Sequence, residues 1–176
     1  MANKNRKIAE IYEKGIGTEY EKEFKTFGIS EHNKVLHIGC GAYPLTEITL
    51  VNVTGTKVVG VDKNPKAVNL ANEIIRKKNL DEKIAIYTGN GLNYPVDKFD
   101  VIIVSSCSIP KEEILENVFK RVKKNSAIIV REIDYAIDYI LDYIDHHNDI
   151  TLVKKMRFNT MFLIPIFWNA LYLKKN

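Results

Sequence analysis

Short apolar runs alternate with amphipathic segments through most of this chain, and the alternation predicts its secondary structure. The runs are rich in Val and Ile, which is typical of buried strands. They cover residues 34–40, 57–62, 83–89, 99–106 and 126–132. Segments with apolar residues at helical spacing separate them, at 44–53, 64–80 and 110–124. Strands that alternate with helices in this way indicate an α/β fold, with a mostly parallel sheet covered by helices on both faces.

The two ends of the chain depart from this alternation. Residues 3–26 suggest two short helices broken near Gly15 and Gly17. Residues 133–147 suggest one more helix, and the strands at 150–158 and 167–175 follow each other so closely that we expect a C-terminal antiparallel hairpin. We therefore divide the chain into an N-terminal helical lid, residues 1–30, and a single α/β domain, residues 31–176.

The composition fits one domain with a substantial core. The chain has 176 residues, of which 45% are hydrophobic, and this is too short for two ordinary domains. Its net charge of +4 is mild and spread along the chain, so we do not expect a nucleic-acid partner. No segment has the pattern of a signal peptide or 18 uninterrupted apolar residues, so we expect a cytoplasmic protein that does not enter a membrane.

A glycine turn and a later acid point to a nucleoside ligand. Gly39 and Gly41 end the first expected strand, and Asp62 ends the second, 21 residues after Gly41. In parallel α/β sheets, ligands lie outside the carboxyl ends of the strands, where glycines let the backbone approach and a carboxylate accepts ribose hydroxyls. The alternative is that Asp62 only caps the next helix. A dinucleotide would need a third glycine and free N–H groups where Tyr43 and Pro44 stand, which argues against NAD.

This plan resembles the Rossmann-like fold of class I S-adenosylmethionine (SAM)-dependent methyltransferases. The stretch IGCGAYPLT, residues 38–46, is also similar to the G-x-G-P-x-P-L-T turn of nicotianamine synthases, which use SAM as an aminocarboxypropyl donor. That resemblance extends from about Val35 to Glu132. It implies that Gly39, Gly41 and residues 43–46 shape the amino-acid end of a SAM pocket. The chain has no counterpart of that family's large N-terminal helical domain, which favours methyl transfer.

The cofactor-binding residues are expected at the carboxyl ends of the first four strands. Asn90 stands where the methyltransferase superfamily commonly has an acid beside the adenine, and its amide carbonyl can accept the same hydrogen bond. The alternative is that residues 89–91 form only a tight turn. The expected set is Gly39, Cys40, Gly41, Tyr43, Pro44, Asp62, Lys63, Asn90, Gly91, Leu92 and Ser105.

The acceptor is expected beyond the cofactor, near the end of the fifth strand. Glu132 is the carboxylate at the exit of that strand, so it is the candidate catalytic residue, as a base or as a group that orients the acceptor. The alternative is a salt bridge to Arg131 or a cap for the helix near Asp134. Substrate contacts are expected from Tyr20, Cys107 and Tyr135, together with the apolar connection around Phe162 and Pro165.

Other polar residues are expected to be structural. His37 lies inside the first strand and is expected to be a satisfied core residue rather than a base. No serine or cysteine triad is expected, because no histidine follows the fourth strand at a suitable position. Three aspartates, Asp134, Asp138 and Asp142, recur at helical spacing and read as a solvated acidic face, so no metal is expected.

Three functions remain open at this point. The first is a SAM-dependent methyltransferase that acts on a small-molecule acceptor, and a homodimer is compatible with it. The second is aminocarboxypropyl transfer from SAM, which would leave methylthioadenosine as by-product. The third is a subunit without catalysis that binds SAM or nothing and uses residues 162–173 as an interaction surface.

Overall fold

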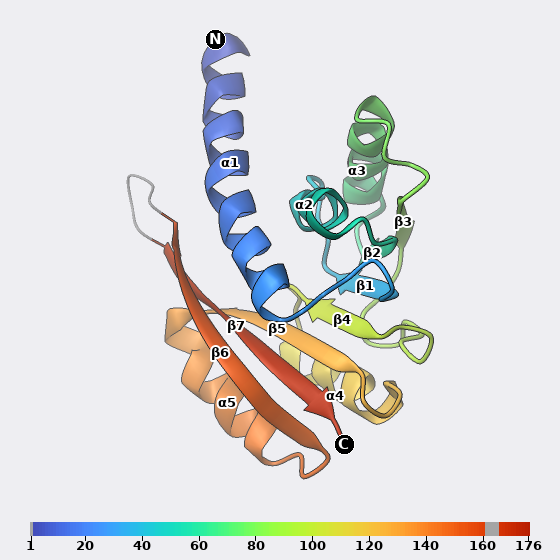
Figure 1. Cartoon of the computed structure of the whole chain (residues 1–176), viewed down its shortest axis with the longest axis vertical. Helices are drawn as coiled ribbons and strands as arrows, with labels where there is room; N and C mark the ends of the chain where they lie inside the picture. The colour runs from blue at the N-terminus through green and yellow to red at the C-terminus, as the bar shows by residue number, and fades with distance from the viewer. Residues whose placement is uncertain (1, 161–165) are drawn as a thin grey trace.

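The computed structural model describes the backbone of residues 2–160 and 166–176, and the side chains of residues 14–159 and 167–176. Phe162 and Pro165 lie outside the described residues. One seven-stranded sheet organises the chain (Figure 1). Its strands are β1 (Val35–Ile38), β2 (Val58–Asp62), β3 (Ile84–Thr88), β4 (Val101–Val104), β5 (Ala127–Ile133), β6 (Ile150–Thr160) and β7 (Ile166–Lys175).

The strand order is β3-β2-β1-β4-β5-β7-β6. The first five strands pair in parallel, and β7 pairs antiparallel with both β5 and β6. Order and direction confirm the α/β expectation of a mostly parallel sheet that ends in an antiparallel hairpin. The carboxyl ends of β1, β2, β3, β4 and β5 therefore share one edge, where such sheets bind ligands.

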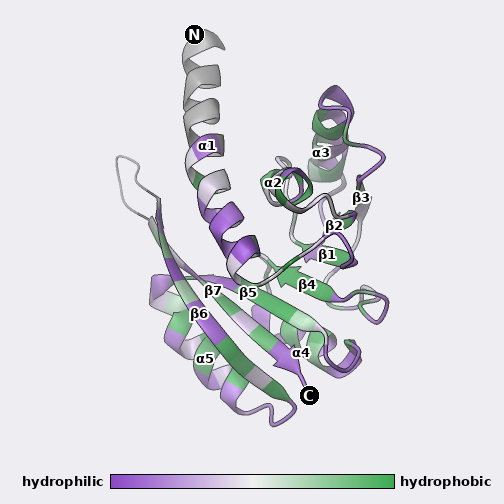
Figure 2. Ribbon diagram, in the orientation of Figure 1, coloured by the Kyte–Doolittle hydropathy of each residue, from purple (hydrophilic) through white to green (hydrophobic). Residues whose placement is uncertain are grey.

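Helices cover both faces of the sheet (Figure 1). They are α1 (Ala2–Thr26), α2 (Leu45–Thr54), α3 (Pro65–Lys77), α4 (Lys111–Arg121) and α5 (Ile137–Asp145), with a 3-10 turn at Asp134–Ala136. One buried cluster joins β1, β2 and β4 to α1, α2 and α3, and the other joins the opposite face to α4 and α5. Figure 2 shows β4 as hydrophobic along its length, as expected for a strand buried on both faces.

The expected break near Gly15 and Gly17 was wrong, because α1 is one continuous helix. Two glycines weaken a helix by about 1 kcal/mol each relative to Ala, but packing outweighs this cost. Phe24 is fully buried, and a Cβ at Gly17 would lie only 3.5 Å from Thr49 Oγ1 on α2. The last turns of α1 thus belong to the same core as the strands, and burying a side chain such as Phe24 contributes about 1.5 to 3 kcal/mol.

The local signal at the start of α3 was more reliable. The Asn64 side chain accepts a hydrogen bond from the Lys66 N–H with Pro65 at the first helical position, as expected. The segment 133–147 is divided, since Ile133 ends β5 and Asp134 lies in the 3-10 turn before α5. Asp134 is therefore not on one helical face with Asp138, and it pairs with Arg157 of β6 instead. No described helix is both long and apolar enough to cross a membrane.

Candidate functional site

The glycine turn after β1 lies at the carboxyl edge, where its first glycine, Gly39, lines a cavity. Gly39 and Gly41 have φ angles of 85° and 68°, which residues with a side chain rarely adopt. A Cβ at Gly39 would also lie 2.2 Å from Ser108 Oγ, so this position needs glycine for space as well. The N–H groups of Gly39 and Cys40 both donate to the Val61 carbonyl, which fixes the turn against β2.

Asp62 is held at the end of β2 by two backbone hydrogen bonds. Its Oδ2 accepts from the Gly41 N–H at 3.0 Å, and its Oδ1 accepts from the Asn64 N–H at 2.9 Å. The helix cap is Asn64 itself, so the role of Asp62 as a cap for α3 is not needed. A carboxylate has about four lone-pair positions, and two of these remain for a ligand.

The cavity has a volume of about 160 Å³. Six of the residues expected in the site line it, namely Gly39, Asp62, Lys63, Asn90, Gly91 and Cys107. The others around it are Ile38, Val61, Gly89, Ser108, Ile109 and Ile114. Lys63 Nζ donates to the Ile109 carbonyl at 3.2 Å, so the Lys63 side chain joins the β2 wall to the loop after β4.

The segment around Asn90 forms a tight turn beside the cavity. Asn90 Oδ1 accepts from the Leu92 N–H at 3.1 Å, so the side chain stabilises a tight turn. A Cβ at Gly91 would lie 2.7 Å from Ile38 Cγ2, which explains the glycine. Asn90 nevertheless lines the cavity, and an amide oxygen can accept a second hydrogen bond.

Several expected residues do not line the cavity. Cys40 is buried below the turn, where burial and the nearby carboxylates of Glu47 and Asp62 raise the pKa of its thiol. Tyr135 is 88% exposed in the 3-10 turn, and Tyr20 lies on α1 with its ring 3.8 Å from Arg131 Cζ. The remaining ones outside the lining are Gly41, Tyr43, Pro44, Leu92, Ser105 and Glu132.

A buried ion pair ties α1 to the end of β5. Arg131 is 2% exposed and Glu23 is fully buried, with 2.8 Å between Arg131 Nη2 and Glu23 Oε1. Arg131 Nη1 also donates to Thr46 Oγ1 at 2.7 Å, so this threonine of the P-L-T stretch anchors β5. Burial alone would lower the pKa of Arg131, but Glu23 and the neighbouring groups outweigh it and raise that pKa.

Glu132 pairs with Lys111, on the other face of the sheet. Glu132 is 6% exposed, and its Oε2 lies 3.3 Å from Lys111 Nζ. Lys111 also donates to the carbonyls of Ser105 and Arg131, and it thereby links the ends of β4 and β5. The alternative of a bridge from Glu132 to Arg131 was wrong. Burial lowers the pKa of Lys111, and Glu132 offsets this shift only in part.

His37 joins a serine to a carboxylate, a contact that the sequence analysis did not predict. His37 is a satisfied core residue, as expected, but its partners are Glu47, 2.7 Å from Nδ1, and Ser105 Oγ, 3.2 Å from Nε2. The histidine precedes the serine by 68 residues, so a search for a histidine after β4 misses it. A usable sequence signal was Glu47, the only charged residue in the segment 44–53, because a carboxylate in a buried helix needs a partner.

Gly60 makes room for Glu47, and this supports a stability prediction. A Cβ at Gly60 would lie 2.6 Å from Glu47 Oε1 and 2.5 Å from Ile86 Cδ1. Gly60→Ala is therefore expected to lower the free energy of unfolding by about 1 to 3 kcal/mol in chemical denaturation. Gly15→Ala is the matched control, because nothing lies within 4 Å of its Cβ and we expect a gain of up to about 1 kcal/mol. Equal stability of Gly60→Ala and the parent would contradict this packing.

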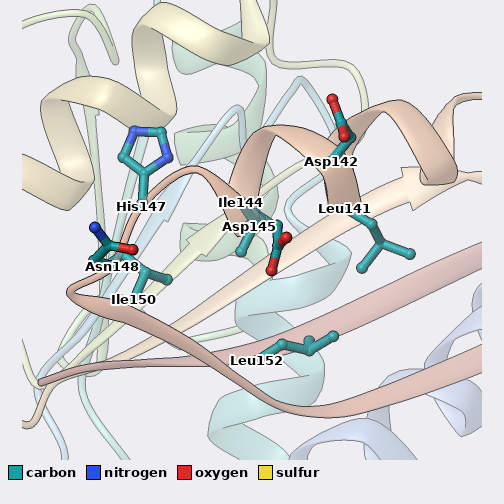
Figure 3. Close-up of a pocket in the computed structure, with 8 residues that line it drawn as sticks. All are labelled: Leu141, Asp142, Ile144, Asp145, His147, Asn148, Ile150 and Leu152. Atoms are coloured by element: carbon teal, nitrogen blue, oxygen red, sulfur yellow. The ribbon is translucent and has the colours of Figure 1, made fainter.

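A larger hollow lies away from this edge. It has a volume of about 550 Å³ between the end of α5, the following loop and the start of β6 (Figure 3). Ile150 in its wall pairs with Lys175, whose neighbour Lys174 pairs with Ala127 at the beginning of β5. The hollow is thus at the edge where the parallel strands begin. No cluster of metal-ligating side chains occurs among the described residues.

The chain is similar to known methyltransferases. A family model described as a methyltransferase domain matches residues 29–162. L-histidine 2-aminobutanoyltransferase of Yersinia pestis is 30% identical over 63% of this chain and 42% of its own length. A probable cobalt-precorrin-6B C(15)-methyltransferase (decarboxylating) of Saccharolobus solfataricus is 30% identical over 58% and 53%, respectively. The chain thus spans about half the length of these relatives or less.

Solved structures share the fold. A mutant of MtNAS in complex with S-adenosylmethionine superposes with a TM-score of 0.69 at 23% identity. The match covers 88% of this chain and 60% of that one. At this identity the likeness shows the Rossmann-like fold.

Proposed function

Because the chain belongs to the methyltransferase domain family, we propose that it is a SAM-dependent methyltransferase that acts on a small-molecule acceptor. The observation that carries this proposal is that the glycine turn, Asp62 and Asn90 border one cavity at the carboxyl edge of the sheet. Binding of a nucleoside with a free ribose requires a turn of glycines with positive φ, a fixed carboxylate and an amide.

The residues of the site fit this cofactor. Asp62 would accept the ribose hydroxyls, Asn90 the adenine amino group, and the turn at Gly39 and Gly41 would border the amino-acid part. When bound, SAM supplies a methyl group that its sulfonium has already activated. The cavity is smaller than the roughly 300 to 1,000 Å³ of ordinary ligand pockets. We therefore expect Lys63 to release the Ile109 carbonyl when the ligand enters.

The protein itself positions the acceptor and accepts the proton that the acceptor loses. Because placement of the acceptor does most of the work in a transfer from an activated donor, the rigid carboxyl edge is well suited to it. Lys111 and Glu132 stabilise this edge by joining the ends of β4 and β5. Cys107, exposed in the cavity wall, and Tyr135, exposed after β5, are the proposed acceptor contacts.

A second function, aminocarboxypropyl transfer, is favoured by one specific observation. The stretch GCGAYPLT begins at Gly39 in the cavity wall, and the Y. pestis relative is named as an aminobutanoyltransferase. In this chain Thr46 of that stretch is 4% exposed and bonded to Arg131. Its hydroxyl is thus engaged inside the protein rather than presented to a ligand.

The experiment that tests the proposal combines binding with product analysis. Calorimetry with SAM and S-adenosylhomocysteine should show binding at one site per chain. Incubation with SAM and L-histidine or other small amines and alcohols should release S-adenosylhomocysteine. Methylthioadenosine as the by-product would instead establish the second function, and absence of any SAM binding would contradict both.

Glu132→Gln is expected to lower turnover by about 100-fold and to leave SAM affinity nearly unchanged, if Glu132 orients or deprotonates the acceptor. Glutamine keeps the size of the side chain and an oxygen for the Ile133 N–H, which Glu132 Oε1 now accepts at 2.9 Å. The measurement is the initial rate of S-adenosylhomocysteine formation, with chemical denaturation alongside. Reduced stability with unaltered turnover would show that Glu132 only holds Lys111 in place.

A further inference from the structure

Three polar side chains from three elements form a line beneath the glycine turn. Glu47 comes from α2, His37 from β1 and Ser105 from the loop after β4. Distances of 2.7 Å and 3.2 Å join Glu47 to His37 and His37 to Ser105. Glu47 is fully buried and His37 is 2% exposed, whereas Ser105 is only half-buried, so the line runs from the core to the surface.

The order of these groups decides where the protons lie. An ionised Glu47 can only accept, so His37 donates through Nδ1–H. In the neutral imidazole, Nε2 then carries a lone pair and accepts from the Ser105 hydroxyl. Ser105 therefore keeps lone pairs that can accept a proton from outside. Ser105 is next to the cavity, because a Cβ at Gly39 in the cavity wall would lie 3.1 Å from Ser105 Cβ.

This arrangement is costly for a purely structural device. Glu47 Oε2 is buried and has no hydrogen-bond partner among the described residues, and Gly60 is needed to leave space for the carboxylate. The other charged or titratable groups packed near Glu47 are Cys40 and Arg131, and Arg131 is already bonded to Glu23. A protein in which apolar residues replace a buried ion pair is often as stable as the parent or more stable. Stability alone therefore does not account for Glu47.

We propose that Ser105, His37 and Glu47 form a proton relay. The relay serves an acceptor that attacks through the nitrogen of an amine or the oxygen of a hydroxyl, each of which carries a proton, and not through carbon. This inference rests on the proposed transferase function. As the acceptor's N–H or O–H bond breaks, its proton passes to Ser105 Oγ and the Ser105 proton passes to His37 Nε2. The electron pair left on the acceptor forms the bond to the transferred carbon, and the electrons of the broken C–S bond stay on sulfur. His37 becomes an imidazolium beside Glu47 and returns its proton to solvent through Ser105 after release.

The first test does not depend on activity. Nitrogen-15 NMR detects the imidazoles of the four histidines in the 176-residue chain. Comparison with His37→Gln assigns the signals of His37. We expect His37 to be protonated at Nδ1 and bare at Nε2, and Ser105→Ala to move the Nε2 resonance while Nδ1 changes little. A parent protein with a proton on Nε2 at neutral pH would overturn the relay, because His37 could not then accept one.

The second test uses SAM with L-histidine as the probe amine. Ser105→Ala is expected to lower kcat by about 100-fold with KM and SAM affinity unchanged, and Ser105→Cys, which keeps a protic group, to recover part of the rate. Ser126→Ala is the matched control, since its hydroxyl donates to the Phe99 carbonyl at the opposite edge of the sheet. Unchanged kcat in Ser105→Ala would overturn the relay. A parent that neither binds SAM nor transfers a group would contradict the proposed function instead, and the NMR result would then decide on the relay alone.

Discussion

Glu23→Ala is expected to lower the free energy of unfolding by about 3 to 5 kcal/mol, because it leaves the buried guanidinium of Arg131 without its carboxylate. Both side chains are at most 2% exposed, and Arg131 makes three hydrogen-bond contacts with the Glu23 oxygens. Thr46 and the Tyr20 ring remain as neighbours but carry no compensating charge, and Glu47, which also helps to raise the pKa of Arg131, is bonded to His37. Chemical denaturation followed by circular dichroism measures the effect.

Glu21→Ala is the matched control on the same helix. Glu21 pairs with Lys25 on the surface, where ion pairs contribute about 0 to 1 kcal/mol. The double variant Glu23→Leu with Arg131→Met should recover most of the lost stability, since apolar replacements of a buried pair are often neutral or better. A single variant Glu23→Ala as stable as Glu21→Ala would show that the pair contributes nothing to the attachment of α1.

This pair bears on how the N-terminal segment works. We propose residues 1–30 as a lid, but Glu23 and Phe24 are fully buried against the sheet and α2. Any movement that opens the site must therefore leave the last turns of α1 in place. Figure 1 shows the N-terminal part of α1 extending beyond the sheet.

The sequence predicted the elements well because their signals are local. Val and Ile runs marked all five parallel strands, and Asn64 with Pro65 marked the start of α3 to the residue. Asp62 was placed correctly at the carboxyl edge, since that placement needs only the ends of neighbouring strands. The break expected at Gly15 and Gly17 failed because tertiary packing, which a local pattern does not contain, stabilises α1.

The polar contacts of the site depend on long-range pairing, and the sequence predicted them poorly. Arg131 and Glu132 are neighbours on β5, so their side chains point to opposite faces of the sheet and a bridge between them is disfavoured. Arg131 meets Glu23, 108 residues earlier, and Glu132 meets Lys111 on α4. Strand alternation alone could have excluded the bridge, but only the fold identifies the actual partners. Likewise, only the fold identifies Ser105 as a hydrogen-bond partner of His37.

Asp62→Ala is expected to weaken SAM binding by about 2 to 3 kcal/mol, or roughly 30- to 150-fold, because it leaves two ribose hydroxyls without a charged acceptor. Isothermal calorimetry with SAM measures the change at constant ionic strength. Asp62→Asn should fall between the parent and Asp62→Ala, since an amide oxygen can replace one acceptor without its charge.

The control must separate ligand contact from loss of the turn, because Asp62 also accepts from the N–H groups of Gly41 and Asn64. Two nucleoside probes, one with and one without the 2′ and 3′ hydroxyls, make that separation. Adenosine should lose affinity for Asp62→Ala by the same factor as SAM, whereas 2′,3′-dideoxyadenosine should bind the parent and the variant alike. If Asp62→Ala loses affinity for the dideoxy probe by the same factor as for adenosine, the loss of binding comes from a disturbed turn. If parent and Asp62→Ala bind SAM equally well, the ribose does not rest on this carboxylate.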